Sequence, residues 1–248
     1  MSPSPMELSA SELFRLIATR ALAPSELMEA YLARLSAANP AVNAIVSAVD
    51  PDELRAQARA LDDAPPRGWL HGLPLAVKDL VAVRGVRTTY GSPLYRDHVP
   101  EEDDLVAARL RAAGAILAGK TNTPEWGQGS HSFNPVFGAT RNPYDLTRSA
   151  GGSSGGAAAA LAARLVPVAD GSDMMGSLRN PAAFCNVYGF RPSWGLVPAD
   201  AAGDTFLSTL ATDGPMARTI EDLARLLETL AGPNPGVPFG RDCPSLAD

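Results

Sequence analysis

Apolar side chains near the start of the chain recur at helical spacing. Within residues 9–38 they fall three or four positions apart in two runs, one after Ser11 and one after Ser25. Side chains at this spacing share one face of a helix, and a serine at the start can cap the free backbone N–H groups. We therefore predict that two amphipathic helices open the chain, capped by Ser11 and Ser25.

Short apolar runs then alternate with further helical patterns. The predicted strands are 44–49, 73–77, 115–118 and 166–169. The predicted helices are 50–60, which begins at Asp50-Pro51, 105–113, which Gly114 ends, 157–165, and 218–230, which Thr219 caps and Gly232 closes. Proline in the first turn and glycine after the last are typical of helix ends. The alternation of helices and buried strands predicts an α/β fold.

Two segments lack any such period. Residues 121–156 are rich in Gly, Ser, Asn and Pro but also contain Trp126, Phe133, Phe137 and Tyr144. A loop of this length inside a compact domain is usually functional or disordered, and the aromatic side chains favour function. Residues 233–248 hold four prolines without a pattern, and we predict an irregular tail there.

Composition and charge narrow the class of protein. The 248 residues are 46% hydrophobic and 19% charged, which suits a soluble globular protein with a large core. The net charge is -6 and the basic residues are scattered, so we expect neither nucleic acid nor membrane as a partner. No signal-peptide pattern or long apolar stretch is present, and the expected location is cytoplasmic. Cys185 and Cys243 form no metal-ligand spacing, and we expect reduced thiols and no metal.

Two familiar motifs fail when their structural context is considered. Residues 114–121 read GAILAGKT and match the phosphate-loop pattern, but the residues between the two glycines are themselves the predicted strand. Residues 151–155 read GGSSG and match the nucleophile elbow of α/β-hydrolases, in which the histidine must follow the serine. The three histidines, His71, His98 and His131, all precede Ser153 and are expected in surface or loop positions. A nucleophilic serine therefore needs another base.

Three segments supply one. They are Gly72-Leu-Pro-Leu-Ala-Val-Lys78-Asp79, Gly151-Gly-Ser153-Ser154-Gly-Gly156, and the run from Gly171 to Cys185, which contains Asp173-Met-Met-Gly176-Ser177-Leu-Arg179. In these segments and their intervals the chain resembles the amidase signature family. The resemblance implies a mixed central β-sheet flanked by α-helices, and a Ser-Ser-Lys triad with Ser177 as nucleophile, Ser153 as bridge and Lys78 as base. No cofactor or metal is then needed.

Elementary physical chemistry explains why the triad uses these residue types. Lys78 follows an apolar strand, so folding should bury its amine and lower its pKa toward neutrality. A neutral lysine can take a proton through Ser153 from Ser177, whose oxygen attacks an amide carbonyl to form an acyl-enzyme that water then hydrolyses. We therefore predict an amidase that cleaves a small carboxamide.

The resemblance also implies supporting roles for the surrounding residues. It implies a cis peptide bond between Gly152 and Ser153, and an oxyanion hole made of the backbone N–H groups of Met174, Met175, Gly176 and Ser177. Asp173 and Arg179 should hold this turn, and Ser154 should form hydrogen bonds within the triad loop. Trp126, Gly127 and Gln128 fall where the family's pocket wall begins and are expected to bind substrate.

Two departures from the family pattern stand out. Met175 occupies the position of a family glycine, so we expect either that its side chain disturbs the oxyanion turn or that its thioether lines the acyl pocket. The chain is also about half as long as family members usually are, so we expect a fold that is incomplete at its C-terminus and prone to dimerise or aggregate.

The resemblance predicts three segments and leaves two alternative functions open. The segments are an N-terminal helical part at 1–63 packed on the core, the amidase signature core at 64–232, and the tail at 233–248. The alternatives are an ammonia-supplying chain like the A-type component of the tRNA-dependent amidotransferase, which would need a partner chain, and a catalytically impaired relative. A homodimer is the other partnership considered.

Overall fold

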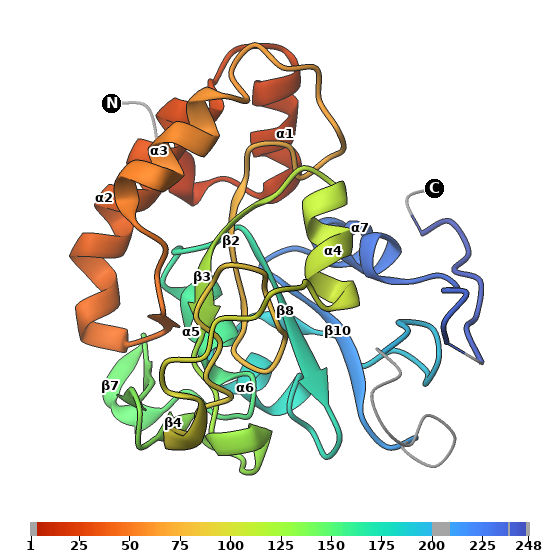
Figure 1. Cartoon of the computed structure of the whole chain (residues 1–248). Helices are drawn as coiled ribbons and strands as arrows, with labels where there is room; N and C mark the ends of the chain where they lie inside the picture. Colours follow the sequence, from red (N-terminus) through yellow and green to blue (C-terminus); the bar gives the residue numbers. More distant parts are fainter. Residues whose placement is uncertain (1–3, 200–208, 238, 247–248) are drawn as a thin grey trace.

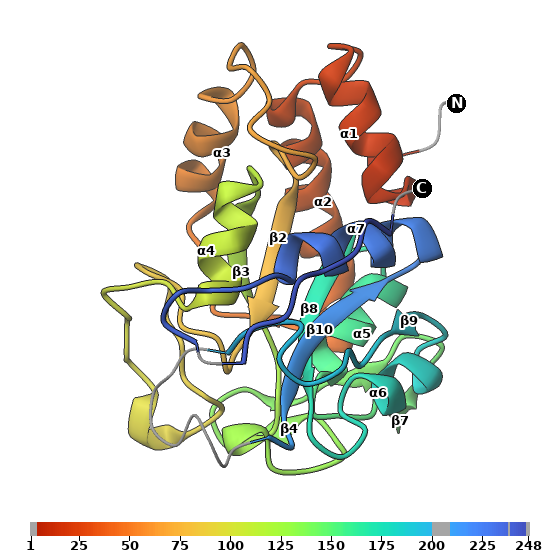
Figure 2. The same ribbon diagram turned by 90° about the vertical axis from the view of Figure 1, so that its right-hand side faces the viewer.

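A computed structural model places the helices around a central β-structure (Figure 1), and it describes residues 4–199, 209–237 and 239–246. Helices α1 (Ala10–Ala18), α2 (Pro24–Val42) and α3 (Pro51–Arg59) gather at one end of the molecule. Figure 2 shows α4 (Leu105–Ala112) and α7 (Ile220–Leu230) together in front of the strands, with α5 (Gly155–Ala162) behind them. Buried apolar side chains from all of these helices and from the long strands form one hydrophobic cluster.

The central strands form two three-stranded sheets. The first has the order β1-β3-β2, in which β3 (Ile116–Thr121) runs parallel to β2 (Pro74–Lys78) and antiparallel to β1 (Ile45–Val46). The second has the order β8-β10-β9, in which β10 (Thr212–Ala217) pairs antiparallel with β8 (Val168–Asp173) and with β9 (Tyr188–Gly189). The backbone amide of Lys78 donates to the carboxylate of Asp170 at 3.0 Å, which ties β2 to β8. The fold is therefore mixed α/β.

The predicted helices form, but two of their caps were predicted wrongly. Helix α1 is capped by Ser9, whose hydroxyl accepts from the amide of Glu12, while Ser11 donates to Asp222 on α7. Helix α2 begins at Pro24 without a side-chain cap and continues through Pro40 to Val42. Helix α7 is capped by Thr219, as predicted, and α3 by Asp50. A serine directly before the apolar positions of a helix is therefore not always the residue that caps that helix.

The long segment without a period contains more structure than the sequence predicts. It holds a 3-10 turn and two small hairpins, formed by η3 (Glu125–Gly127), β4 (Phe133–Asn134), β5 (Gly138–Ala139), β6 (Arg141–Asn142) and β7 (Asp145–Ser149). Elements absent from the sequence prediction are β9, β10, α6 (Arg179–Phe184), η1 (Pro5–Glu7) and η2 (Pro93–Tyr95). Strand β1 is shorter than predicted, and β3 extends through Lys120. The phosphate-loop lysine thus lies within a strand.

The histidines, the cysteines and the C-terminal tail can also be compared with their predicted positions. His71 lies in a turn before β2, which agrees with the predicted loop position, but it is 1% exposed and therefore not at the surface, whereas His131 is exposed on a loop. Both cysteines are free thiols, and Cys185 is buried. The described part of the tail contains no helix or strand, and residues 238, 247 and 248 lie outside the description. The division into segments 1–63, 64–232 and 233–248 stays a prediction.

Candidate active site

The last residue of β2 places a lysine amine inside the protein. Lys78 is fully buried, and its Nζ lies 2.7 Å from Ser153 Oγ, 2.9 Å from Ser154 Oγ and 2.8 Å from Ser172 Oγ. Three hydroxyl oxygens therefore surround the amine, which has three N–H donors when protonated. Two of these serines belong to the predicted triad loop, and the third lies on β8.

This environment changes the protonation of the lysine. Burial lowers the pKa of Lys78 to about 8, although the carboxylates of Asp170, Asp213 and Asp173 act in the opposite direction. Hydroxyl groups solvate an ammonium less well than water does, so the neutral amine gains relative to the charged one. A neutral lysine near physiological pH can accept a proton, which an ordinary lysine cannot do.

The loop that contains Ser153 is fixed by hydrogen bonds with another serine, Ser132. The peptide bond between Gly152 and Ser153 is cis. The hydroxyl of Ser132 donates to the carbonyl of Ser153 at 3.0 Å and accepts from the amide of Gly155 at 2.9 Å. Helix α5 begins at Gly155, directly after the loop. The loop is therefore fixed both by a buried hydrogen-bonded side chain and by the helix that follows it.

The turn that contains Ser177 lies against the same loop. The amide of Ser154 donates to the carbonyl of Ser177 at 3.2 Å. Asp173 holds the turn, since its carboxylate accepts from the amides of Gly176 at 2.7 Å and Leu178 at 3.2 Å and from Arg179 Nε at 2.9 Å. Burial alone would raise the pKa of Asp173, but the hydrogen bonds from Arg179 and the two amides outweigh it and hold the pKa at about 2. Asp173 therefore stays ionised.

These contacts also bear on the expected oxyanion donors. The N–H of Gly176 already donates to Asp173, whereas Met174 and Met175 precede it in the turn. Met175 is 89% exposed and is not among the described non-glycine residues with positive φ. Its side chain therefore extends outward and does not occupy the inside of the turn. Glycine at this position is not required by a left-handed backbone.

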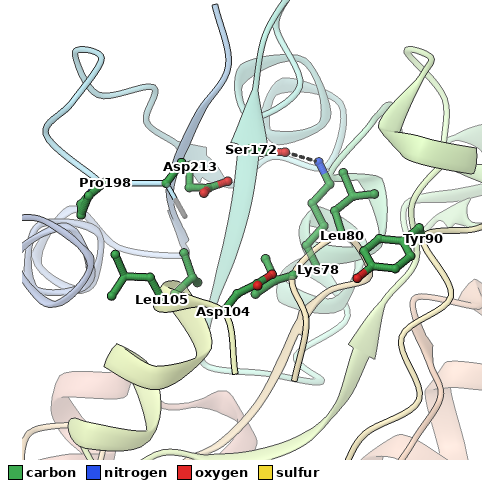
Figure 3. A pocket seen from close by; sticks show the side chains of 11 residues that line it. Lys78, Leu80, Tyr90, Asp104, Leu105, Ser172, Pro198 and Asp213 are labelled. Carbon is green, nitrogen blue, oxygen red and sulfur yellow. Dashed lines mark hydrogen bonds between the residues drawn. The ribbon is translucent and has the colours of Figure 1, made fainter. Parts of the chain in front are cut away.

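A cavity of about 330 Å³ opens beside the lysine (Figure 3). In this view Lys78, Leu80 and Tyr90 lie on one side of the cavity, and Asp213 and Pro198 lie on the opposite side. Asp104 and Leu105 lie between the two sides, and Ser172 lies next to the amine of Lys78. The cavity thus combines apolar surface with carboxylate, hydroxyl and amine groups next to the predicted base.

Trp126, Gly127 and Gln128, the residues expected to bind substrate, differ in how close they lie to this site. A Cβ added to Gly127 would lie 3.8 Å from Ser153 Oγ, so the backbone here adjoins the predicted bridge. Trp126 stacks on Tyr90 with ring centroids 5.4 Å apart, and Tyr90 in turn lines the cavity. Gln128 is exposed to solvent. Trp126 and Gly127 are therefore adjacent to the site, and no contact of the Gln128 side chain with it is seen.

Two polar residues of β8 belong to the site although the sequence analysis did not single them out. Ser172 bonds the amine of Lys78, and Asp170 accepts the backbone amide of the same residue. They occupy alternate positions of a strand whose neighbours Val168 and Ala169 are buried and apolar. Polar residues two apart point to the same face of a strand, so this signal was present in the sequence.

The second buried lysine lies in a different environment. Lys120 is fully buried, its amine donates to the carbonyl of Val81, and burial lowers its pKa to about 8 while Asp79 opposes the shift. Val77, not Lys78, pairs with Lys120 across the strands, so the two lysines lie on opposite faces. The GKT sequence is therefore part of a packed sheet.

Neither a metal cluster nor a membrane-spanning helix is found in the part of the chain that the structure describes. No group of three or more His, Cys, Asp or Glu side chains is arranged to hold an ion there. Among the same residues, no helix is long and apolar enough to cross a bilayer.

Comparison with known proteins gives a consistent result. The Amidase family model matches residues 26–245. The A-type component of the glutamyl-tRNA(Gln) amidotransferase of Thermus thermophilus is 45% identical over 226 residues, which cover 91% of this chain and 47% of the relative. An acylamidase of Rhodococcus erythropolis is 43% identical over 238 residues, 94% of this chain and 49% of the relative.

Solved structures agree with the sequence matches. A bacterial aryl acylamidase of the amidase signature enzymes superposes with a TM-score of 0.91 at 35% identity, over 97% of this chain and 51% of that one. A 6-aminohexanoate cyclic dimer hydrolase bound to its substrate gives 0.88 at 34% identity, over 97% and 50%. The chain thus spans about half the length of the relatives it matches.

Proposed function

The chain belongs to the amidase signature family, and on that premise we propose that it hydrolyses a small carboxamide to a carboxylate and ammonia or an amine. The observation that carries this proposal is the fully buried amine of Lys78, which three serine hydroxyls surround and whose pKa is lowered to about 8. A lysine with only a structural role would stay charged, and a carboxylate partner would stabilise that charge more than hydroxyl groups do. The arrangement suits a base that works through a serine.

The proposed reaction uses Ser177 as nucleophile. Neutral Lys78 accepts the proton of the Ser153 hydroxyl while Ser153 accepts that of Ser177, and the Ser177 oxygen attacks the amide carbonyl carbon. As the tetrahedral intermediate collapses, the C–N bond breaks and the same path returns the proton to the leaving nitrogen. Water then attacks the acyl-enzyme with Lys78 again as base. The products are a carboxylic acid and an amine or ammonia, and Ser177 is regenerated.

The negative oxygen of the intermediate needs donors in the turn before Ser177. The amides of Met174, Met175 and Ser177 are our candidates, with Gly176 available only if its bond to Asp173 loosens. Such donors each contribute about 3 to 4 kcal/mol to a transition state when well aimed. Asp173, Arg179 and Ser154 act as positioning residues in this proposal.

An ammonia-supplying component of an amidotransferase is the second candidate. The observation that favours it is the 45% identity to an A-type amidotransferase component, which is as high as the identity to an acylamidase. Such a component would release ammonia from an amide donor and pass it to a partner chain. Turnover of simple amides by the isolated chain would favour the amidase, and turnover that needs a partner would favour the amidotransferase component.

A serine-directed fluorophosphonate tests the proposal directly. We expect stoichiometric labelling, with the modified peptide containing Ser177, and no labelling of Ser177→Ala. A screen of aliphatic and aromatic amides for ammonia release would then identify the acyl group. Absence of both labelling and turnover would support the catalytically impaired relative instead.

A further inference from the structure

A second cavity adjoins the loop that contains Ser153. It has a volume of about 420 Å³, is open to solvent, and is lined by residues of the two hairpins β4–β5 and β6–β7, which Figure 1 places at the end of the molecule opposite α1. Its size falls within the range of ligand pockets, roughly 300 to 1,000 Å³. None of its lining residues belongs to the cavity beside Lys78.

The wall of this cavity is mostly apolar, but three basic residues are among those that line it. They are Arg141, Arg148 and His131, although the whole chain carries a net charge of -6. Arg148 has a long contact of 3.5 Å with Asp145, and Arg141 makes no ion pair within the described residues. Phe133, which is 62% exposed, and Leu146, which is 45% exposed, supply the apolar part.

The cavity is joined to the catalytic loop by direct contacts. His131 Nδ1 lies 2.7 Å from Ser149 Oγ, and the same oxygen accepts from the amide of Gly151 at 3.0 Å. A Cβ on Gly152 would lie 2.8 Å from the backbone nitrogen of His131, so the two segments pack without room between them. A molecule bound against His131 and Ser149 would therefore touch residues that hold the loop.

We propose that this cavity is a binding site for a small carboxylate with an apolar body. A guanidinium binds a carboxylate through paired charge-assisted hydrogen bonds, which places the anionic end at Arg141 and Arg148. The exposed faces of Phe133 and Leu146 then cover the apolar body. A free phosphate would use the arginines and leave the apolar part of the wall unused. The site is independent of whether Ser177 hydrolyses amides.

The test is a titration of 15N-labelled protein with sodium benzoate at constant ionic strength, followed by NMR. We expect saturable shifts of the backbone amides at 131–149 and in the adjoining 151–155. Arg141→Met and Arg148→Met should each weaken binding about tenfold, the effect of losing a charge-assisted hydrogen bond. Arg141→Lys keeps the charge but not the paired hydrogen bonds, so it should retain only part of the affinity. Arg59→Met, which removes an exposed charge on α3, should change nothing.

Benzyl alcohol serves as the probe without a carboxylate. It should bind at least about tenfold more weakly, and equal binding would overturn the carboxylate assignment. The site itself would be refuted by an absence of saturable shifts, or by shifts gathered instead around Lys78, Tyr90 and Ser177, which would place benzoate in the active site. Because no outcome depends on turnover, failure here is distinct from failure of the proposed hydrolysis.

Discussion

The amine of Lys78 lies 2.7 Å from the hydroxyl of Ser153, a residue 75 positions later in the chain. The lysine is the last residue of β2, and the serine lies in the loop before α5. The amine also forms hydrogen bonds with the hydroxyl groups of Ser154 and Ser172. The arrangement buries a basic group among hydroxyl groups, and burial lowers its pKa to about 8. Its protonation therefore changes just above neutral pH.

The first prediction concerns the pH dependence of the reaction. Because the pKa of Lys78 is lowered to about 8, the rate of fluorophosphonate labelling should rise with pH and level off above that value. Lys78→Met should reduce the rate at least about a hundredfold, since a general base typically contributes that much. The measurement is the labelling rate between about pH 6 and 10, on either side of that pKa. A flat profile, or a variant with nearly the original rate, would refute Lys78 as the base.

The second prediction separates the serines. Ser177→Ala should abolish labelling and turnover, and Ser153→Ala should lower both about a hundredfold by breaking the proton path. Ser172→Ala should have a smaller effect, because Ser153 and Ser154 still contact the amine. Mass spectrometry of the labelled peptides identifies the site. If Ser177→Ala is still labelled and Ser153→Ala is not, the two roles are exchanged.

The third prediction concerns Met175. The side chain is 89% exposed and its backbone does not have positive φ, so we expect no relief of strain in Met175→Gly. The rates on all amides should stay within about twofold, as is usual for an exposed position. Rates on a panel of amides decide the matter. A uniform gain on all substrates would instead show that methionine disturbs the oxyanion donors.

The fourth prediction concerns Arg179. Its two hydrogen bonds, at 2.9 and 3.1 Å, are the largest influence that keeps Asp173 ionised against burial, and Asp173 in turn fixes the amides of Gly176 and Leu178. Arg179→Met should therefore lower kcat at least about tenfold, the effect of losing charge-assisted hydrogen bonds, with little change in KM. Arg179→Lys should restore part of the loss. The measurement is steady-state kinetics of both variants. If Arg179→Met and Arg179→Lys lower kcat equally, the loss reflects a folding defect and not the hydrogen bonds to Asp173.

The fifth prediction concerns stability and pH. Burial lowers the pKa values of Lys78 and Lys120 to about 8, while a lysine in the unfolded chain has a pKa of about 10.4. Between these values the unfolded chain binds more protons, so the free energy of unfolding should rise with pH from about 8 to 10. Lys120→Met removes one of the two groups and should roughly halve this slope. Urea unfolding at several pH values measures it, and an unchanged slope would show that Lys120 does not contribute.

Much of the site could be predicted from the sequence because its chemistry lies in short local patterns. The apolar run 73–77 predicted a buried strand that ends at Lys78, and residues 151–156 together with the apolar run that follows them predicted a loop entering a helix. The patterns at 50–60 and 218–230 predicted α3, with its start at Asp50-Pro51, and α7, with its cap Thr219. Each of these features depends on neighbours within a few positions. Local backbone preference and side-chain periodicity suffice to determine them.

The tertiary structure decided what depends on distant partners. Ser172 reaches Lys78 across 94 positions, and Asp170 does so across 92. Their alternation in the sequence indicates a shared face of a strand, but it does not indicate which residue that face meets. Ser11 bonds Asp222 across 211 positions and is therefore not free to act as a helix cap. The exposure of Met175 likewise follows from how Asp173 holds the turn. Such contacts arise only when strands and helices pack, because a buried polar group is stabilised by a hydrogen-bond partner and the fold determines which residue can be that partner.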